Sequence, residues 1–212
     1  IIVRSIMRKQ LIQLFCVIFA IFYVKQISAN QNDITLKQLV LGGKEEFHLR
    51  ILEAIPENGQ ITTGSNDAEN VIIEFFDYKC GYCVKMHPEL IDIAEKRDDT
   101  KIVFLQLPIL SEFSAKLSRL VLAANYQDKG FELHNAILTQ KGSITEEKVS
   151  KIIEELEIDT KKIKEDLNRT EIEDSLHLTS FIAQAIGVRG TPAVFINNEF
   201  NPGYVPKDIL KN

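Results

Sequence analysis

The sequence has few of the residues that mark unusual protein classes. It holds only 3 cysteines, 10 glycines and 6 prolines among 212 residues. So few glycines and prolines exclude a collagen-like or low-complexity chain, and three cysteines are too few for a framework of several disulfides. Basic residues are not in excess either, because 25 lysines and arginines face 30 acidic residues. No nucleic-acid partner is expected, since such domains normally present a basic stripe.

The N-terminus shows the pattern of a secretory signal. Basic residues precede an apolar run at 11–24, and Ser28-Ala29 supplies small residues for cleavage. This run is short for a membrane-spanning helix, which needs about 20 residues. We therefore expect residues 1–29 to be a cleaved signal peptide and the protein to be exported, most simply to a periplasm. An uncleaved N-terminal anchor is the alternative.

One cysteine pair remains after cleavage. Cys16 lies inside the apolar run and is lost with it, which leaves Cys80 and Cys83. The same cleavage removes four basic residues and no acidic one, so the formal charge changes from −5 to −9. Disulfides persist in oxidising compartments, and a bridge between residues this close encloses too small a loop to stabilise a fold. The pair therefore predicts redox chemistry.

The rest of the chain predicts an α/β domain interrupted by helices. Short apolar runs indicate buried strands at 71–76, 101–107 and 193–196, and a weak fourth strand follows at 199–204. Helical spacing follows the first strand over 80–96 and dominates from 111 to about 187. We expect residues 66–212 to form one domain with a helical insertion at about 111–187, and residues 30–65 to be an N-terminal helical extension.

Cys80 and Cys83 open the helix that follows the first strand. There the first sulfur faces unpaired backbone N–H groups and the positive helix end, which stabilise a thiolate. Cys83 lies one turn further in and is more buried. This asymmetry predicts that Cys80 reacts with the substrate and that Cys83 resolves the mixed disulfide. A structural bridge and a zinc site completed by His87 are the alternatives.

Two segments, EFFDYKCGYC and GVRGTPAVFIN, resemble the DsbA-like thiol–disulfide oxidoreductases of the thioredoxin superfamily. The resemblance covers roughly residues 66–205 and implies a thioredoxin-like fold with a helical insertion. It also implies that Pro192 follows a cis peptide bond beside the cysteines, and that Thr191 offers backbone atoms to an extended substrate. Gly81 and Tyr82 complete the expected substrate-binding residues. The disulfide itself is the redox centre, so no metal or organic cofactor is expected.

Glu74 is the one charged residue in the first strand. The resemblance implies that it lies beneath the active site and shuttles the proton of the resolving cysteine, because burial would raise its pKa. A solvent-facing edge position is the alternative. The histidines are interpreted as ordinary: His87 as a helix-surface residue, and His48, His134 and His177 as forming no group.

We therefore expect an exported oxidoreductase that introduces disulfides into folding proteins with cysteines and is reset by a quinone-linked membrane oxidase. The CGYC and Thr-Pro-Ala segments also echo bacterial disulfide isomerases, which leaves an isomerase or reductase with a membrane reductant supplier open. Residues 30–65 show no dimerisation domain of the isomerase kind. A non-enzymatic exported binding protein is the third alternative. The last helix of a thioredoxin unit is nearly missing after Leu210, and we therefore expect either a marginal domain or a truncated chain.

Overall fold

The structure is a computed structural model and describes residues 46–210. The signal peptide expected at 1–29, and residues 30–45 of the expected extension, lie outside the described residues. Within the described part of the chain, no helix combines the length and the apolar character needed to cross a membrane.

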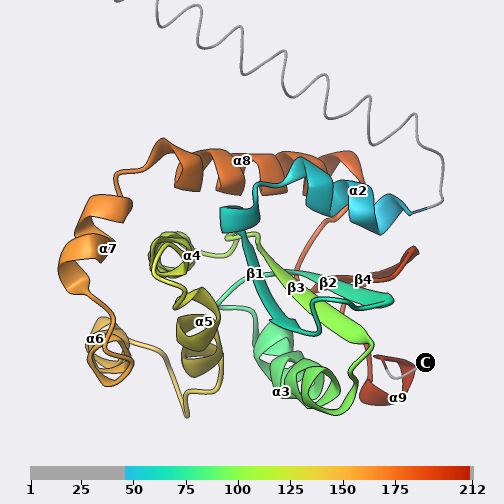
Figure 1. Cartoon of the computed structure of the whole chain (residues 1–212), viewed down its shortest axis with the longest axis horizontal. Coiled ribbons are helices and arrows are strands. Elements are labelled where there is room, and N and C mark those ends of the chain that lie inside the picture. The colour runs from blue at the N-terminus through green and yellow to red at the C-terminus, as the bar shows by residue number, and fades with distance from the viewer. Residues whose placement is uncertain (1–45, 211–212) are drawn as a thin grey trace, which may run out of the picture. The chain divides into compact units, whose positions relative to one another are not determined.

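A five-stranded sheet is central to the described domain (Figure 1). Its order is β1-β3-β2-β4-β5, and only β2 and β3 run parallel. The strands are β1 (Gln60–Gly64), β2 (Asn70–Phe76), β3 (Thr100–Gln106), β4 (Ala193–Ile196) and β5 (Glu199–Pro202). Nearly every residue of β2 and β3 is buried, as expected for apolar strands covered on both faces. The three predicted buried strands are thus confirmed to within one residue.

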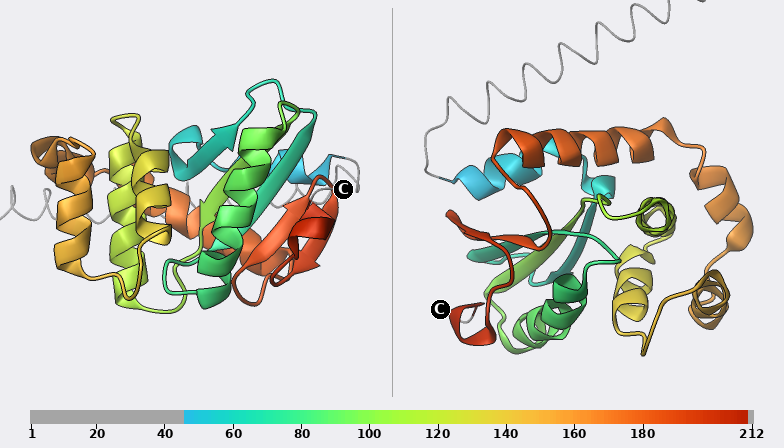
Figure 2. Two further views of the ribbon diagram at one scale, coloured as in Figure 1. Left: turned by 90° about the horizontal axis from the view of Figure 1, so that it is seen from below. Right: turned by 180° about the vertical axis from the view of Figure 1, so that it is seen from behind.

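Helices cover both faces of this sheet. One face carries α2 (Phe47–Ala54) and α8 (Thr170–Ala185), and the other carries α3 (Gly81–Lys96) and the short α9 (Lys207–Leu210) (Figures 1 and 2). Beside the sheet lie α4 (Glu112–Asn125), α5 (Gly130–Leu138), α6 (Glu146–Glu155) and α7 (Thr160–Asp166). The helical segment predicted between the second and third strands is therefore present, and its last helix packs over the sheet.

The start of the domain differs from the expectation. Residues 60–64 were expected within a helical extension, but they form the edge strand β1, in which Gln60 pairs with Leu105 of β3. A single-turn helix, η1 (Glu57–Gly59), joins α2 to this strand. The segment QITTG has one apolar side chain, Ile61, which is fully buried, so it lacks the apolar run of a central strand. The domain therefore begins before residue 66.

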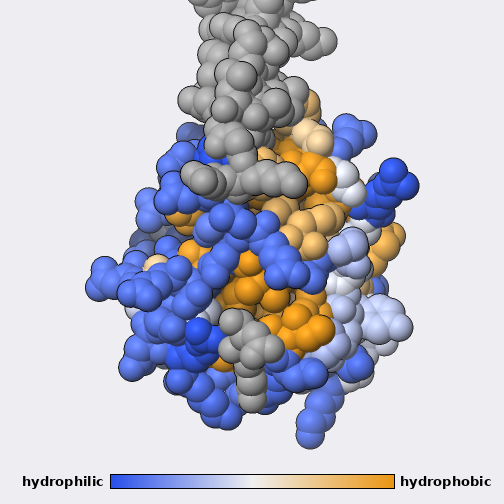
Figure 3. All heavy atoms as spheres, turned by 90° about the vertical axis from the view of Figure 1, so that its right-hand side faces the viewer, coloured by the Kyte–Doolittle hydropathy of each residue, from blue (hydrophilic) through white to orange (hydrophobic). Residues whose placement is uncertain are grey.

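Burial decreases toward the opposite edge of the sheet. All four residues of β5 are half-buried or exposed, in contrast to β2. On the side of the molecule that carries α9, hydrophobic residues gather in the middle of the surface and hydrophilic ones surround them (Figure 3). Ile209 of α9 is 50% exposed. The sheet is thus covered less completely beside β5 than at its centre.

Candidate active site

The two cysteines lie just beyond the end of β2, where α3 begins. Cys80 is the N-cap residue of α3, and its Sγ accepts a hydrogen bond from the backbone N–H of Cys83 at 3.3 Å. The first N–H groups of a helix have no partner within the helix, so an acceptor at the N-cap satisfies one of them. Both cysteines carry free thiols in this structure. The predicted helix start at the cysteine pair is confirmed.

The surroundings of Cys80 favour its thiolate. The contact with Cys83 is the largest influence and lowers the pKa of Cys80 from 9.0 to about 6. Burial opposes this shift, whereas Thr191 and the backbone N–H groups of Cys83 and Tyr82 support it. With a pKa of about 6, the Cys80 side chain is mostly ionised at pH 7. Such a sulfur is both a ready nucleophile and a good leaving group.

Cys83 has the opposite character. Its side chain is deeper, with 1% exposed. Burial raises the pKa of Cys83 far above its usual range, and both the contact with Cys80 and the nearby Glu74 carboxyl raise it further. At neutral pH the pair therefore holds one charge, on Cys80, and one proton, on Cys83.

The segment around Pro192 lies against Cys80. The Cys80 Sγ and the Thr191 carbonyl oxygen are 3.2 Å apart, although 111 residues separate them in the sequence. The Thr191–Pro192 peptide bond is cis, as the family resemblance implies. A groove of about 260 Å³ continues from Thr191 and Pro192 past Phe200 and Pro202 of β5. The fold thus joins the two resembling segments in one site.

Gly81 and Tyr82, between the cysteines, face the surface. Tyr82 is 63% exposed, and its ring lies 6.0 Å from that of Tyr204. A side chain at Gly81 would meet no atom within 4 Å. Sequence reasoning missed two further exposed residues, Ile109 and Leu110, which are 51% and 53% exposed. They lie in the loop after β3, and no periodic pattern distinguishes them from core residues.

Glu74 occupies the middle of the sheet rather than an edge. It lies on β2 between Phe104 of β3 and Val194 of β4, and only 1% of it is exposed. The solvent-facing alternative is therefore wrong. Burial raises the pKa of Glu74 well above its usual range; an interaction with the Cys83 thiol opposes the rise, and the charge of Cys80 adds to it. The carboxyl thus tends to hold a proton next to Cys83.

His87 is a buried residue, which corrects its interpretation as a surface histidine. Cys83, His87 and Leu90 recur at the spacing of one helix face, and all three are buried. The Nε2 of His87 lies 2.9 Å from Oδ1 of Asn135 on α5. A histidine is compatible with either a buried or an exposed helix face, so its residue type alone does not indicate which face it occupies.

His134 of α5 is also buried and does belong to a group. Its ring centre is 5.0 Å from that of His87, and its Nδ1 lies 3.0 Å from the Tyr78 hydroxyl. This contact joins segments far apart in the sequence, so no local pattern could indicate it. The described residues contain no group of three or more histidine, cysteine or acidic side chains placed to hold a metal ion. The zinc alternative therefore gains no support.

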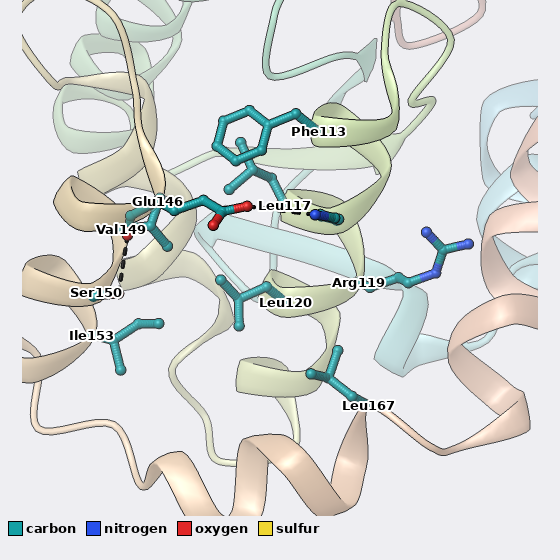
Figure 4. A pocket seen from close by; sticks show the side chains of 10 residues that line it. Phe113, Leu117, Arg119, Leu120, Glu146, Val149, Ser150, Ile153 and Leu167 are labelled. Carbon is teal, nitrogen blue, oxygen red and sulfur yellow. Dashed lines mark hydrogen bonds and ion pairs between the residues drawn. The ribbon is translucent and has the colours of Figure 1, made fainter.

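A separate hollow lies within the insertion (Figure 4). It has a volume of about 490 Å³ and lies between α4, α6 and the end of α7. Leu117 and Leu120 face Val149 and Ile153 across it. At its rim, the Lys116 Nζ and the Glu146 Oε1 are 3.5 Å apart. No residue of the cysteine site lines this hollow.

Comparisons with known proteins agree with the geometry of the cysteine site. The family model described as a DSBA-like thioredoxin domain matches residues 71–212. Over 167 residues the chain is 29% identical to a probable disulfide bond formation protein D of Bacillus anthracis, covering 72% of this chain and 75% of the relative. Over 169 residues it is 24% identical to disulfide bond formation protein D of Bacillus subtilis, covering 72% and 74%.

Solved structures give the same result. A thioredoxin-like oxidoreductase from Silicibacter pomeroyi superposes with a TM-score of 0.69 at 28% identity, covering 74% of this chain and 90% of that one. The catalytic domain of Proteus mirabilis ScsC gives a TM-score of 0.65 at 28% identity, covering 73% and 86%. Since the family model spans most of the sheet, the cysteine pair and the Thr191–Pro192 segment, this chain belongs to the DSBA-like thioredoxin domain family and is a thiol–disulfide oxidoreductase.

Proposed function

We propose that the protein is an exported oxidase that passes a Cys80–Cys83 disulfide to cysteine pairs in folding proteins. The observation that carries this proposal is the place of Cys80 at the N-cap of α3, where its Sγ accepts the Cys83 N–H and its pKa is lowered. Stabilising one thiolate stabilises the reduced form, which makes the corresponding disulfide a stronger oxidant. The names of the Bacillus relatives, disulfide bond formation proteins, support the same direction.

The first step of the reaction forms a mixed disulfide. A client thiolate attacks the Cys80 sulfur, the Cys80–Cys83 bond breaks, and Cys83 leaves with the electron pair. Because burial favours the protonated form of Glu74, this carboxyl can give Cys83 its proton as it leaves.

The second step releases the client. Its other thiolate attacks the client sulfur of the mixed disulfide, and Cys80 leaves as the thiolate that its surroundings favour. Over both steps the client loses two electrons and two protons, and the Cys80–Cys83 pair gains two electrons. A membrane oxidase linked to quinone would then restore the disulfide.

The surface around Cys80 suits clients of varied sequence. An extended client can pair with the backbone of Thr191, which needs no particular side chain. The exposed Tyr82 lies between the cysteines, and the exposed Ile109 and Leu110 lie in the loop whose backbone bonds to Asp77; these side chains offer apolar contacts to a client. Such contacts would favour unfolded chains, because folded proteins bury most of their large apolar side chains.

An isomerase or reductase is the second candidate, since the CGYC and Thr-Pro-Ala segments echo the bacterial isomerases. The redox state in the cell separates the two. Acid-quenched cells are treated with an alkylating reagent that adds mass to free thiols, and the protein is detected on gels beside reduced and oxidised standards. A mostly oxidised protein is expected for an oxidase. A mostly reduced protein would contradict the proposal and support the isomerase or reductase.

A further inference from the structure

Asp77 lies between the last residue of β2 and the cysteine turn, and its side chain is completely buried. Cys80, Cys83 and Glu74 account for the electrons and the proton in the reaction above. Asp77 is therefore a buried carboxyl group next to the redox centre that the mechanism does not use. A carboxylate in such a place costs free energy unless several donors surround it.

Three donors from three different segments meet this carboxylate. Its Oδ1 accepts hydrogen bonds from the backbone N–H of Lys79 at 2.7 Å and from the Ser114 hydroxyl at 2.6 Å. Its Oδ2 accepts one from the backbone N–H of Leu110 at 2.9 Å. Hydrogen bonds to an ionised group are roughly twice as strong as neutral ones. The side chain thus connects the cysteine turn, the loop after β3 and the first turn of α4.

On the cysteine side, Asp77 determines the path of the backbone. The bond from Lys79 closes a turn through the Asp77 side chain, and the N–H of Cys80 donates to the Asp77 carbonyl oxygen at 3.0 Å. Both acceptors of one residue therefore hold the turn at 77–80. This turn places Cys80 at the N-cap of α3, with its sulfur beside Thr191.

On the other side, the two serine hydroxyls at the start of α4 form a chain of hydrogen bonds that ends on Asp77. A carboxylate only accepts, so the single hydroxyl proton of Ser114 goes to Asp77. The Ser111 hydroxyl must then donate to the Ser114 Oγ, 3.0 Å away, while it accepts the Ser114 N–H as the N-cap of α4. The positive N-terminal end of α4 also favours a negative charge here.

We propose that Asp77 is a positioning residue for thiol–disulfide exchange. It fixes the turn carrying Cys80 to the loop that presents Ile109 and Leu110 and to the start of α4. The reactive sulfur and these two exposed apolar side chains then keep one relative position. The inference goes beyond the proposed oxidase function and does not depend on it, because a misplaced Cys80 would slow exchange in either direction.

Two serines of α4 provide a matched test. Ser114 and Ser118 lie one turn apart, with 0% and 1% exposed, and Ser114 donates to Asp77. Within the described residues the Ser118 hydroxyl has no hydrogen-bond partner. Ser114→Ala should raise the pKa of Cys80 by about half a unit and lower kcat/KM for a reduced peptide client about threefold to tenfold. Ser118→Ala should change neither. The pKa is measured from the ultraviolet absorbance of the thiolate against pH.

Asp77→Asn is the second variant, tested for the same two quantities, the pKa of Cys80 and kcat/KM. It places an amide N–H₂ where one oxygen now accepts, so both effects should be larger than in Ser114→Ala. The double variant Asp77→Asn/Ser114→Ala should be no slower than Asp77→Asn alone, because the two residues act through one connection. Circular dichroism and Tm show whether each variant is folded.

The proposal fails if Ser114→Ala lowers Tm but leaves the pKa of Cys80 and kcat/KM at the values of Ser118→Ala, since Asp77 would then only stabilise the fold. It also fails if folded Asp77→Asn protein exchanges disulfides like the parent. Where Asp77→Asn does not fold, the comparison of the two serine variants decides.

Discussion

Single residues at the active site have unlike surroundings although they are close in the sequence. Cys80 is held at a helix N-cap, where its pKa is lowered, and Cys83 is deeper, where its pKa is raised. Cys80 is 6% exposed and Cys83 1%, so a client chain meets the first cysteine before the second. The division of labour between the cysteines is therefore open to direct tests by substitution.

Removing Cys83 should trap clients. In Cys83→Ser, a disulfide between Cys80 and a client cannot be resolved by the second cysteine, so mixed disulfides should accumulate on non-reducing gels, roughly tenfold above the parent. Cys80→Ser should give none, because the accessible thiol is absent. Trapping by the Cys80 variant instead would reverse the two roles.

Glu74→Gln should slow the departure of Cys83 about 100-fold at neutral pH, since general acid catalysis typically contributes 10²–10⁴-fold. The carboxyl has a raised pKa, so it can donate a proton below that pKa and loses this ability as the pH rises through it. At a fixed concentration of client thiolate, the parent rate should therefore fall with rising pH, and the variant should not show this fall. Stopped-flow measurements of mixed-disulfide formation would follow both profiles.

The exposed Glu69, just before β2, offers the control. Glu69→Gln should retain the rate and pH profile of the parent. If Glu74→Gln does so as well, the proton of Cys83 comes from another source, and the buried carboxyl has a different role.

Among the secondary-structure elements, the sequence predicts best those whose signals are local. The strands β2 and β3 are continuous apolar runs, and such runs are recognisable without knowing their partners. The edge strand β1 escaped prediction because only Ile61 needs burial there. A strand with one apolar residue is stabilised by its hydrogen bonds to β3, which no pattern within QITTG reveals.

The residues of the candidate site also fall into two groups, those that local sequence predicts and those that depend on tertiary packing. The cysteine pair and Thr191–Pro192 were predicted because they lie in contiguous segments that resemble a family. The contact of His87 with Asn135 and the bonds of Asp77 to Leu110 and Ser114 depend on how separate helices pack. Periodicity shows that a helical residue is buried, but not which residue it meets there.

For the domain as a whole, the buried histidines join its two parts. His87 lies on α3, which covers the sheet, and His134 lies on α5 of the insertion. Burial lowers the pKa of both histidines. The charge of His87 lowers the pKa of His134 further, whereas the hydrogen bond to Asn135 partly offsets the lowering at His87. The native state therefore binds these protons less readily than the unfolded chain. Their contribution to stability is present above the unfolded pKa of about 6.5 and is lost as the pH falls toward the lower native values.

The free energy of unfolding should consequently fall on acidification. For His134 alone the loss between pH 7 and pH 5 is about 2 kcal/mol, and His134→Gln should abolish this part of the pH dependence. Glu74 has the opposite effect on stability, because its raised pKa makes the native state bind a proton more readily than the unfolded chain as the pH falls. The difference between the parent and His134→Gln therefore isolates the contribution of the histidine. Urea unfolding at both pH values measures the difference. The exposed His177, changed to Gln, should retain the full pH dependence; an equal reduction in both variants would contradict the assignment.

The separation of Cys80 from Thr191 by 111 residues has a consequence for the order in which the protein is made. At a synthesis rate of ~5–20 residues per second, the cysteines are made roughly 6–22 s before Thr191. Strand β4, which pairs with β2 beside Glu74, arrives equally late. Throughout that interval the growing chain carries both thiols without the groups that complete the centre around them. A half-made chain therefore carries the cysteine pair but not yet the cis-proline segment and the strand that complete the catalyst.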